Sequence, residues 1–171
     1  MQNAKIDHYL KLLLNQPLLA IGRASNMLWV GFGKEIECTN FRGQKVKKSS
    51  IALHVQSSWR IIDTKRKEII VAQSDFYFPN RLLKEMVEFN WDVQGNNLFD
   101  EKSSNWFKRT SGIYISNYKI NTWGDLLLIF SNSDALEVLI NSSDDAECWR
   151  LFECNSDKPH LVVTGKGVGF E

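Results

Sequence analysis

Hydrophobic residues near the start of the chain recur at three- and four-residue spacing, which is the period of one face of an α-helix. The residues that follow this period are Ile6, Tyr9, Leu10, Leu13 and Leu14. Pro17 ends the pattern, because proline cannot donate the backbone hydrogen bond that a helix interior requires. The pattern therefore predicts a helix over about residues 3–15.

The stretch SSIALHVQSSWRII, residues 49–62, alternates instead at every second residue, as a strand with one buried face does. Its apolar positions are Leu53, Val55, Trp59 and Ile61. Its opposite positions are His54, Gln56 and Arg60. DTKRKE then turns the chain and EIIVAQSDFYF returns it, so residues 50–78 are expected to form an antiparallel pair of strands.

A second helix is predicted at about residues 81–89. Asn80 is a suitable N-cap, and the apolar residues after it have helical spacing. These residues are Leu82, Leu83, Met86 and Val87. The following stretch NWDVQGNNLFDEKSSN is interrupted by Gly and Asn and is interpreted as a loop.

The remainder of the chain has short alternating runs separated by turn residues. The runs are GIYISNYKIN, DLLLIFS, ALEVLI, ECWRLFE and HLVVTGK, and the closing GKGVGFE is interpreted as a frayed terminus. Together these elements predict an α+β single domain over residues 1–171. We expect a curved, mainly antiparallel sheet of about six to eight strands, with an N-terminal helix and one further helix near 81–89.

Composition agrees with a globular protein, since hydrophobic residues make up 43% of the 171 positions. No apolar run approaches the roughly 20 residues that span a bilayer, so no membrane association is expected. The N-terminal MQNAKIDHYLKLLL lacks the features of an export signal. The cysteines at 38, 148 and 154 are odd in number and form no CxxC pair, which predicts free thiols and a cytoplasmic location.

The net charge is only +1, but the charges are segregated along the chain. Residues 42–67 are strongly basic, with Asp63 as their single acid. With Phe41 and Trp59 as possible stacking aromatics, this basic segment allows an RNA-binding accessory role. Direct nucleic-acid binding is not favoured, because acids elsewhere balance the charge and no RNA-recognition motif is present.

Acidic residues concentrate in two later tracts, residues 85–101 and 120–149. If the fold brings them together, they form a negative surface that attracts a basic protein, with nearby tryptophans as anchors. The residues predicted for this surface are Asp92, Asp100, Glu101, Trp123, Asp125, Asp134, Glu137, Asp144, Asp145 and Glu147. The alternative is an ordinary solvated face, with Trp91, Trp106 and Trp123 turned into the core.

His54, Gln56 and Arg60 offer a second possibility, a small-ligand or enzymatic face on one side of a strand. The simpler interpretation is the hydrated side of an antiparallel sheet. No metal site is predicted, because Cys148, Cys154 and His160 lie at intervals of six residues, wider than the two to four typical of zinc ligand pairs. No cofactor and no catalytic residue are expected.

The C-terminal part resembles a known family. GDLLLIFSNSDALEVLI, followed by ECWRLF and HLVVTGKGVGFE, is similar to small bacterial immunity proteins encoded beside polymorphic or contact-dependent growth-inhibition toxins. The resemblance covers roughly residues 124–170. It implies a non-catalytic cytoplasmic inhibitor that masks the active site of one cognate toxin. Many such toxins are nucleases with basic grooves, which an acidic, aromatic-bearing surface would complement.

Overall fold

The computed structural model describes residues 2–40, 42–83 and 88–171 and contains two α-helices and eleven strands. The helices are α1 (Gln2–Lys11) and α2 (Leu98–Arg109), with a short 3-10 helix η1 (Gln73–Tyr77). The strands are β1 (Leu18–Ala24), β2 (Met27–Thr39), β3 (Lys45–Val55), β4 (Ser58–Asp63), β5 (Glu68–Ala72), β6 (Ile115–Ile120), β7 (Leu126–Phe130), β8 (Asp134–Leu139), β9 (Glu147–Glu153), β10 (Leu161–Thr164) and β11 (Gly167–Phe170). The predicted α+β class with mainly antiparallel sheet is confirmed.

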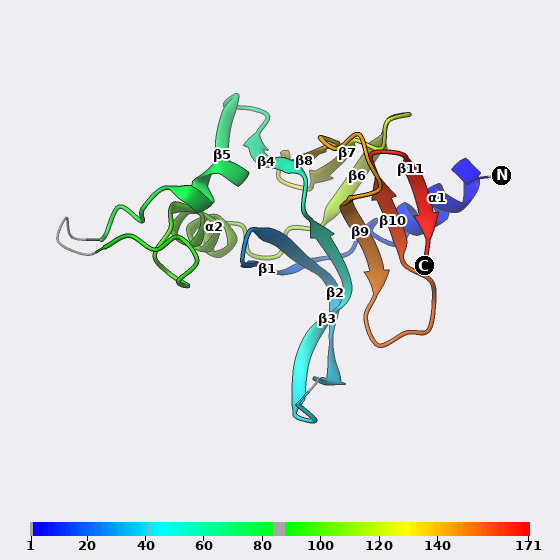
Figure 1. The fold of residues 1–171 in the computed structure, drawn as a ribbon, viewed down its shortest axis with the longest axis horizontal. Helices are drawn as coiled ribbons and strands as arrows, with labels where there is room; N and C mark the ends of the chain where they lie inside the picture. The colour runs from blue at the N-terminus through cyan, green and yellow to red at the C-terminus, as the bar shows by residue number, and fades with distance from the viewer. Residues whose placement is uncertain (1, 41, 84–87) are drawn as a thin grey trace.

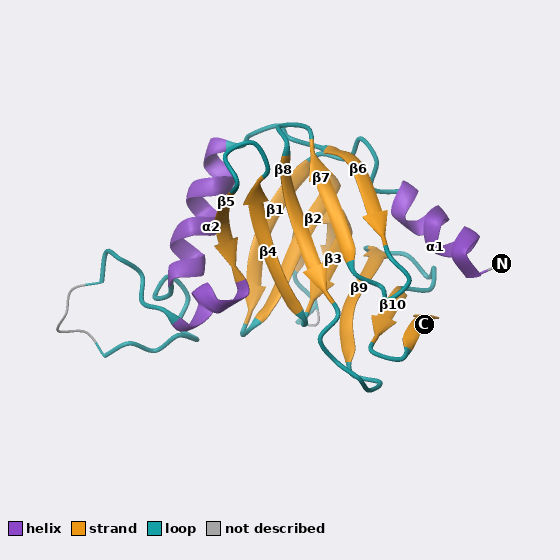
Figure 2. Ribbon diagram, turned by 90° about the horizontal axis from the view of Figure 1, so that it is seen from above, coloured by secondary structure: helices purple, strands orange, loops and turns teal. Residues whose placement is uncertain are grey.

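The strands form two antiparallel sheets that pack face to face (Figures 1 and 2). One sheet has six strands in the order β1-β2-β3-β9-β10-β11, and the other has five in the order β5-β4-β8-β7-β6. The chain passes from the first sheet to the second between Val55 and Ser58, where the backbone N–H groups of Gln56 and Ser57 both donate to the carbonyl of Cys148. The predicted strand over residues 49–62 is therefore two strands, β3 and β4, in different sheets, and the returning strand β5 pairs with β4.

The hydrophobic core lies between the sheets, and the alternation seen in the sequence supplies it. Leu53 and Val55 point into the core from β3, and Trp59 and Ile61 point into it from β4. The indole N–H of Trp149, also fully buried, donates to the carbonyl of Gly124 at 2.9 Å. That bond satisfies the one polar group of a core tryptophan and joins the two sheets at one end.

The two helices close the open sides of this sandwich and lie at its opposite ends (Figure 2). Helix α1 bridges the outer strands β6 and β11: Asp7 accepts a hydrogen bond from the Tyr118 hydroxyl, and the Tyr9 ring lies 5.4 Å from that of Phe170. Helix α2 contacts β1 and β5 at the other end. The N–H of its buried Trp106 donates to the Asp134 carboxylate at 2.8 Å.

The second helix is not where the sequence pattern placed it. The predicted helix near 81–89 falls in part on residues 84–87, which lie outside the described residues; Arg81–Leu83 form a turn, and Leu82 is 83% exposed. Helix α2 occupies part of the predicted loop. Its N-cap is Asn97, whose side chain accepts from the Asp100 backbone N–H at 2.9 Å.

The chain termini also differ in part from the prediction. Helix α1 ends at Lys11, earlier than expected, and the segment after it reaches the sheet through a bridge between Pro17 and Tyr114. The predicted frayed terminus is instead strand β11, which pairs with β10 from Gly167 to Phe170. Within the described residues, no helix has the length and apolar character needed to cross a membrane.

Candidate functional site

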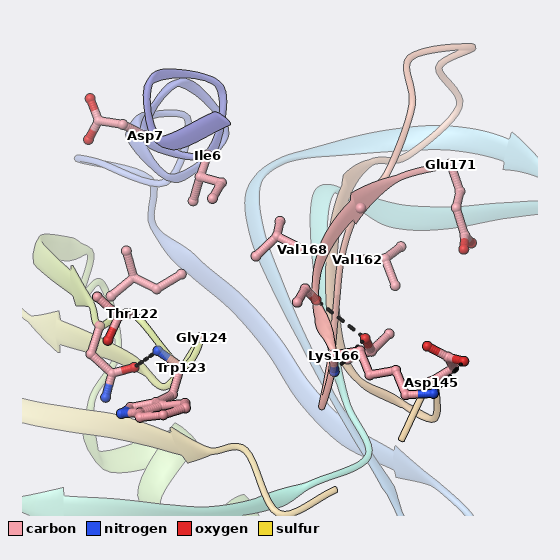
Figure 3. A pocket seen from close by; sticks show the side chains of 15 residues that line it. Ile6, Asp7, Thr122, Trp123, Gly124, Asp145, Val162, Lys166, Val168 and Glu171 are labelled. Carbon is pink, nitrogen blue, oxygen red and sulfur yellow. Dashed lines mark hydrogen bonds and ion pairs between the residues drawn. The ribbon is translucent and has the colours of Figure 1, made fainter. Parts of the chain in front are cut away.

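An open groove of about 750 Å³ lies at the α1 end of the molecule (Figure 3). Three parts of the chain line it: helix α1, the turn between β6 and β7, and the hairpin of β10 and β11. A fourth part, the loop between β8 and β9, contributes Asp145. The floor and walls include Ile6, Gly124, Val162 and Val168, with Trp123 at the rim. Segments that lie far apart in sequence therefore meet here.

Trp123 is the most exposed aromatic residue in the described part of the chain, with 78% of its surface accessible to solvent. Its turn is held by Asn121, whose side-chain oxygen accepts from the backbone N–H groups of Trp123 and Asp125 at 2.9 and 3.0 Å. The Asn121 amide group donates to the Asp125 carboxylate at 2.8 Å, and that carboxylate also accepts from the Ile140 N–H at 2.7 Å. The backbone carrying the exposed indole is thus fixed from both sides.

The groove carries more carboxylates than cations. Asp7, Asp145 and Glu171 line it, with Lys166 as the single lysine or arginine among its lining residues. Two of these carboxylates have cationic partners beside the groove, since Asp7 pairs with Lys11 at 2.7 Å and Glu171 lies 3.5 Å from Arg150. Lys166 bridges Asp144 at 2.8 Å and Asp145 at 3.2 Å. The hydrogen bond from Lys166 lowers the pKa of Asp144 and so favours its ionised form. Because Asp144 and Asp145 share this one cation, the three side chains together keep a net negative charge.

Asp7 belongs to the same wall. A hydrogen bond from Lys11 lowers the pKa of Asp7, and a second bond from Tyr118 acts in the same direction. Burial, followed by the hydrogen bond to Asp7, raises the pKa of the Tyr118 hydroxyl to about 12. Tyr118 is therefore a permanent donor to an ionised Asp7 at neutral pH.

Of the ten residues predicted for an acidic docking surface, four gather at this groove: Trp123, Asp125, Asp144 and Asp145. Asp144 and Asp145 retain highly exposed side chains, at 78% and 77%. Asp125 is engaged in holding the Trp123 turn. Of these four, Trp123 and Asp145 line the groove, and Asp125 and Asp144 lie beside it.

Three more of the predicted acids lie at the opposite end, beside α2. The Asp100 side chain is only 6% exposed and forms a two-pronged ion pair with the buried Arg23, with N–O distances of 2.9 and 3.0 Å. Asp92 lies 3.6 Å from the same guanidinium. Glu101 accepts from the backbone N–H of Arg81 at 2.9 Å. These carboxylates hold the loop before α2 in place.

The last three acids are spread over the sheets. Asp134 is buried and receives the Trp106 N–H, Glu137 pairs with Arg60 on β4, and Glu147 pairs with Arg150 on β9. The ten residues therefore do not converge on one surface. Many of these acids have partners that are distant in sequence, such as Arg23 for Asp100 and Trp106 for Asp134, and linear charge runs do not reveal such pairs.

His54, Gln56 and Arg60 do not share a face either. His54 lies on β3 of the six-stranded sheet and Arg60 on β4 of the five-stranded sheet, and both strands turn their apolar residues into the same core. Their outward side chains therefore face away from each other. The predicted alternation of buried and outward residues is correct. The chain changes sheet near Gln56, however, so His54 and Arg60 lie on different outer faces.

A different arginine joins His54. Arg150 is its cross-strand partner on β9, and it donates to Glu147, which also accepts from Gln56 at 3.2 Å. Burial raises the pKa of Glu147, but the hydrogen bonds and charge of Arg150 outweigh it and the pKa is lowered. A guanidinium nitrogen of Arg150 lies 3.2 Å from His160 Nδ1. Because guanidinium groups only donate, Nδ1 must accept and His160 is neutral.

This cluster is satisfied internally. Phe152 stacks on His160 with ring centroids 4.4 Å apart and meets His54 edge-on at 5.0 Å. Burial lowers the pKa of both histidines, and the charge of Arg150 adds to that effect. The cluster thus packs and pairs its own polar groups, as expected for the outer side of a sheet.

The basic segment 42–67 also divides between two places. Lys45, Lys47 and Lys48 lie on β3 near the tip of the β2–β3 hairpin, whereas Lys65, Arg66 and Lys67 lie in or beside the turn between β4 and β5. Lys47 pairs with Glu35 across the hairpin at 2.6 Å. The two groups belong to different sheets and form no continuous basic surface.

Sequence reasoning missed the groove residues from the two ends of the chain, Asp7, Lys166 and Glu171. The GKGVGFE segment carried a usable signal, since Val168 and Phe170 alternate with glycines as in a short strand. Among the described residues, no three His, Cys, Asp or Glu side chains have a geometry that could hold a metal ion. All three cysteines are free.

Comparisons of this chain with family models, with curated proteins and with solved structures found no match. The resemblance of residues 124–170 to immunity proteins therefore stays a prediction.

Proposed function

We propose that this protein is a non-catalytic inhibitor of the immunity type, which docks one cationic protein partner in the groove beside Trp123. The single observation that carries the proposal is Trp123 itself. The Trp123 indole is 78% exposed, and hydrogen bonds to Asn121 already fix the backbone of its turn. Binding a partner therefore costs little further backbone conformational entropy at this turn. Tryptophan in such a position is the residue type that most often anchors a protein interface.

The charge of the groove defines the partner. Three carboxylates and one lysine line it, and Asp144 adds a further exposed carboxylate at its edge. Lys11 and Arg150 pair with two of the lining carboxylates, so the excess negative charge lies at Asp144 and Asp145. A negative concave surface favours association with a basic protein surface and speeds its diffusional encounter. The basic active-site groove of a nuclease toxin has this character. In this role the protein acts in the cytoplasm, where it would meet its toxin.

The proposal does not depend on a single large acidic surface. Asp100, Asp134 and Glu147 are buried or paired, so they support the fold and do not contact the partner. The partner-facing charge is limited to Asp144, Asp145 and the groove walls. The competing ligand-binding role for His54 and Gln56 is weaker, because Arg150 and Glu147 already satisfy the polar groups around them.

The test begins with the tagged full chain expressed in its source organism. The co-purified protein is identified, produced separately, and titrated against the wild-type chain and its variants. Trp123→Ala is expected to weaken binding by about 30-fold or more, as for an interface anchor. Asp144→Lys with Asp145→Lys is expected to slow association, with a larger effect at low salt.

The control is Leu82→Ala, which removes an apolar side chain that is 83% exposed in the segment between η1 and α2, outside the groove. It should bind as the wild type does. The proposed inhibitory role further requires that the partner alone arrests growth and that the wild-type chain restores it. An acidic or harmless partner, or equal affinities for the Trp123→Ala and Leu82→Ala variants, would overturn the proposal.

A further inference from the structure

The outer face of the five-stranded sheet is apolar and uncovered. In Figure 2 the sheet faces the viewer with both helices at its sides and none across it. Antiparallel sheets normally turn polar residues to water on such a face. Here the residues that point outward are mainly aliphatic: Ile62, Ile69, Leu127, Ile129, Ala135 and Leu139.

The strand register gathers these side chains into one patch. Ile62 is the partner of Ile69 on β5 and of Ala135 on β8, and Ala135 is the partner of Ile129 on β7. Directly cross-strand residues lie on the same face, with Cβ atoms about 5 Å apart. Ile69 is 56% exposed and Leu139 is 46% exposed. An apolar row therefore crosses four adjacent strands.

The next row carries the only ion pair of the patch among the described residues. Arg60 pairs with Glu137 on the neighbouring strand, and Leu127 follows Glu137 on the strand after it. The side chains of Arg60 and Glu137 are 45% and 26% exposed. On β6, Lys119 is the exposed partner of Leu127 and adds a second cation at the edge of the face. The face thus presents the Arg60–Glu137 pair and Lys119 among aliphatic residues, of which Ala135 is only 1% exposed.

We propose that this face binds a second copy of the same chain about a two-fold axis. A two-fold interface uses one patch against itself, so the patch must be self-complementary. The outer face meets this condition: turning a second copy over it sets Arg60 against Glu137 of the partner subunit, and aliphatic rows against each other. The Trp123 groove is a separate surface, so the dimer stands independently of the proposed inhibitory role.

The size of the face sets the expected strength. Strands about 4.8 Å apart and residues about 3.3 Å apart along a strand give a face of about 20 by 17 Å. This is small beside the roughly 800 Å² per partner of a standard interface. The dimer is therefore expected to be weak, in the size range of transient interfaces.

Sedimentation equilibrium of the full chain over a concentration series tests the proposal. The wild-type mass should rise from 19.7 kDa toward twice that value. Ile69→Lys with Leu139→Lys should stay monomeric, because each lysine would be buried against uncharged residues of the second copy. Leu82→Lys, an equally exposed change outside the patch, should dimerise as the wild type does. A wild-type monomer at all concentrations, or a dimer that survives the two patch substitutions, would contradict the proposal.

Charge exchange tests the pairing itself. Arg60→Glu and Glu137→Arg each place two like charges in the patch, so each variant alone should be monomeric. Mixed together, the two variants present opposite charges to one another and should form a heterodimer. A mixture that stays monomeric while the wild type dimerises would overturn the two-fold arrangement.

Discussion

At the scale of single residues, pairing decides what each charged group does. Asp100 and Asp144 are both acids in acidic tracts of the sequence, yet the side chain of the first is 6% exposed and that of the second 78%. The difference comes from a distant partner, Arg23 on β1, which no local pattern couples to Asp100. Sequence reasoning could identify the acids, but it could not predict which of them would remain at the surface.

The histidines on the outer face of the six-stranded sheet give a prediction about pH. Burial lowers the pKa of His54 and of His160 from the ordinary value of 6.5. These two histidines therefore become protonated at a lower pH in the folded protein than in the unfolded chain. The sign follows from linkage: their contribution to stability is fully present above about pH 6.5 and is lost as the pH falls below it.

Urea unfolding at pH 7.5 and pH 5.5 measures this effect. The wild type should lose stability between these values, and His54→Gln with His160→Gln should lose less. His8→Gln removes an exposed imidazole outside the cluster and serves as the control. An equal loss in the wild type and the double variant would show that these two rings do not govern the acid sensitivity.

At the scale of elements, the sequence predicted those whose pattern is purely hydrophobic. The start of α1 and the alternating strands were found because apolar residues mark their buried positions. Helix α2 was missed because its buried face mixes Phe99 and Trp106 with Ser103 and Thr110. The polar members of that face break the apolar period, and the Gly and Asn residues before it indicated a loop.

Helix α2 and the loop before it depend on Arg23. This buried guanidinium donates to Asp100 and to the backbone carbonyl of Val93 at 3.0 Å. Arg23→Met would leave the Asp100 carboxylate buried without its cation, which should cost about 3–5 kcal/mol of unfolding free energy. Lys47→Met breaks an exposed pair with Glu35 and should lower the unfolding free energy far less, because solvent screens that pair. Chemical denaturation compares the two, and similar losses would refute the structural role of Arg23.

At the scale of the whole molecule, two sheets and two helices produce surfaces that the linear sequence does not show. The change of sheet near Gln56 sends His54 and Arg60 to opposite outer faces, and the closing hairpin brings Lys166 to Asp144. The class of the fold followed from local alternation. The division into two sheets did not, because each short strand is equally compatible with one curved sheet or two.

The docking of a cationic protein in the groove beside Trp123 is best tested by cross-linking in the complex of the full chain with its identified partner. A photo-activated cross-linking residue replaces Thr122, which lines the groove, and leaves Trp123 in place. The comparison is the same cross-linking residue at position 82, in the segment between η1 and α2. We expect a cross-link to a basic segment of the partner from position 122 and none from position 82. No cross-link from position 122, or a cross-link from position 82 alone, would refute this docking site.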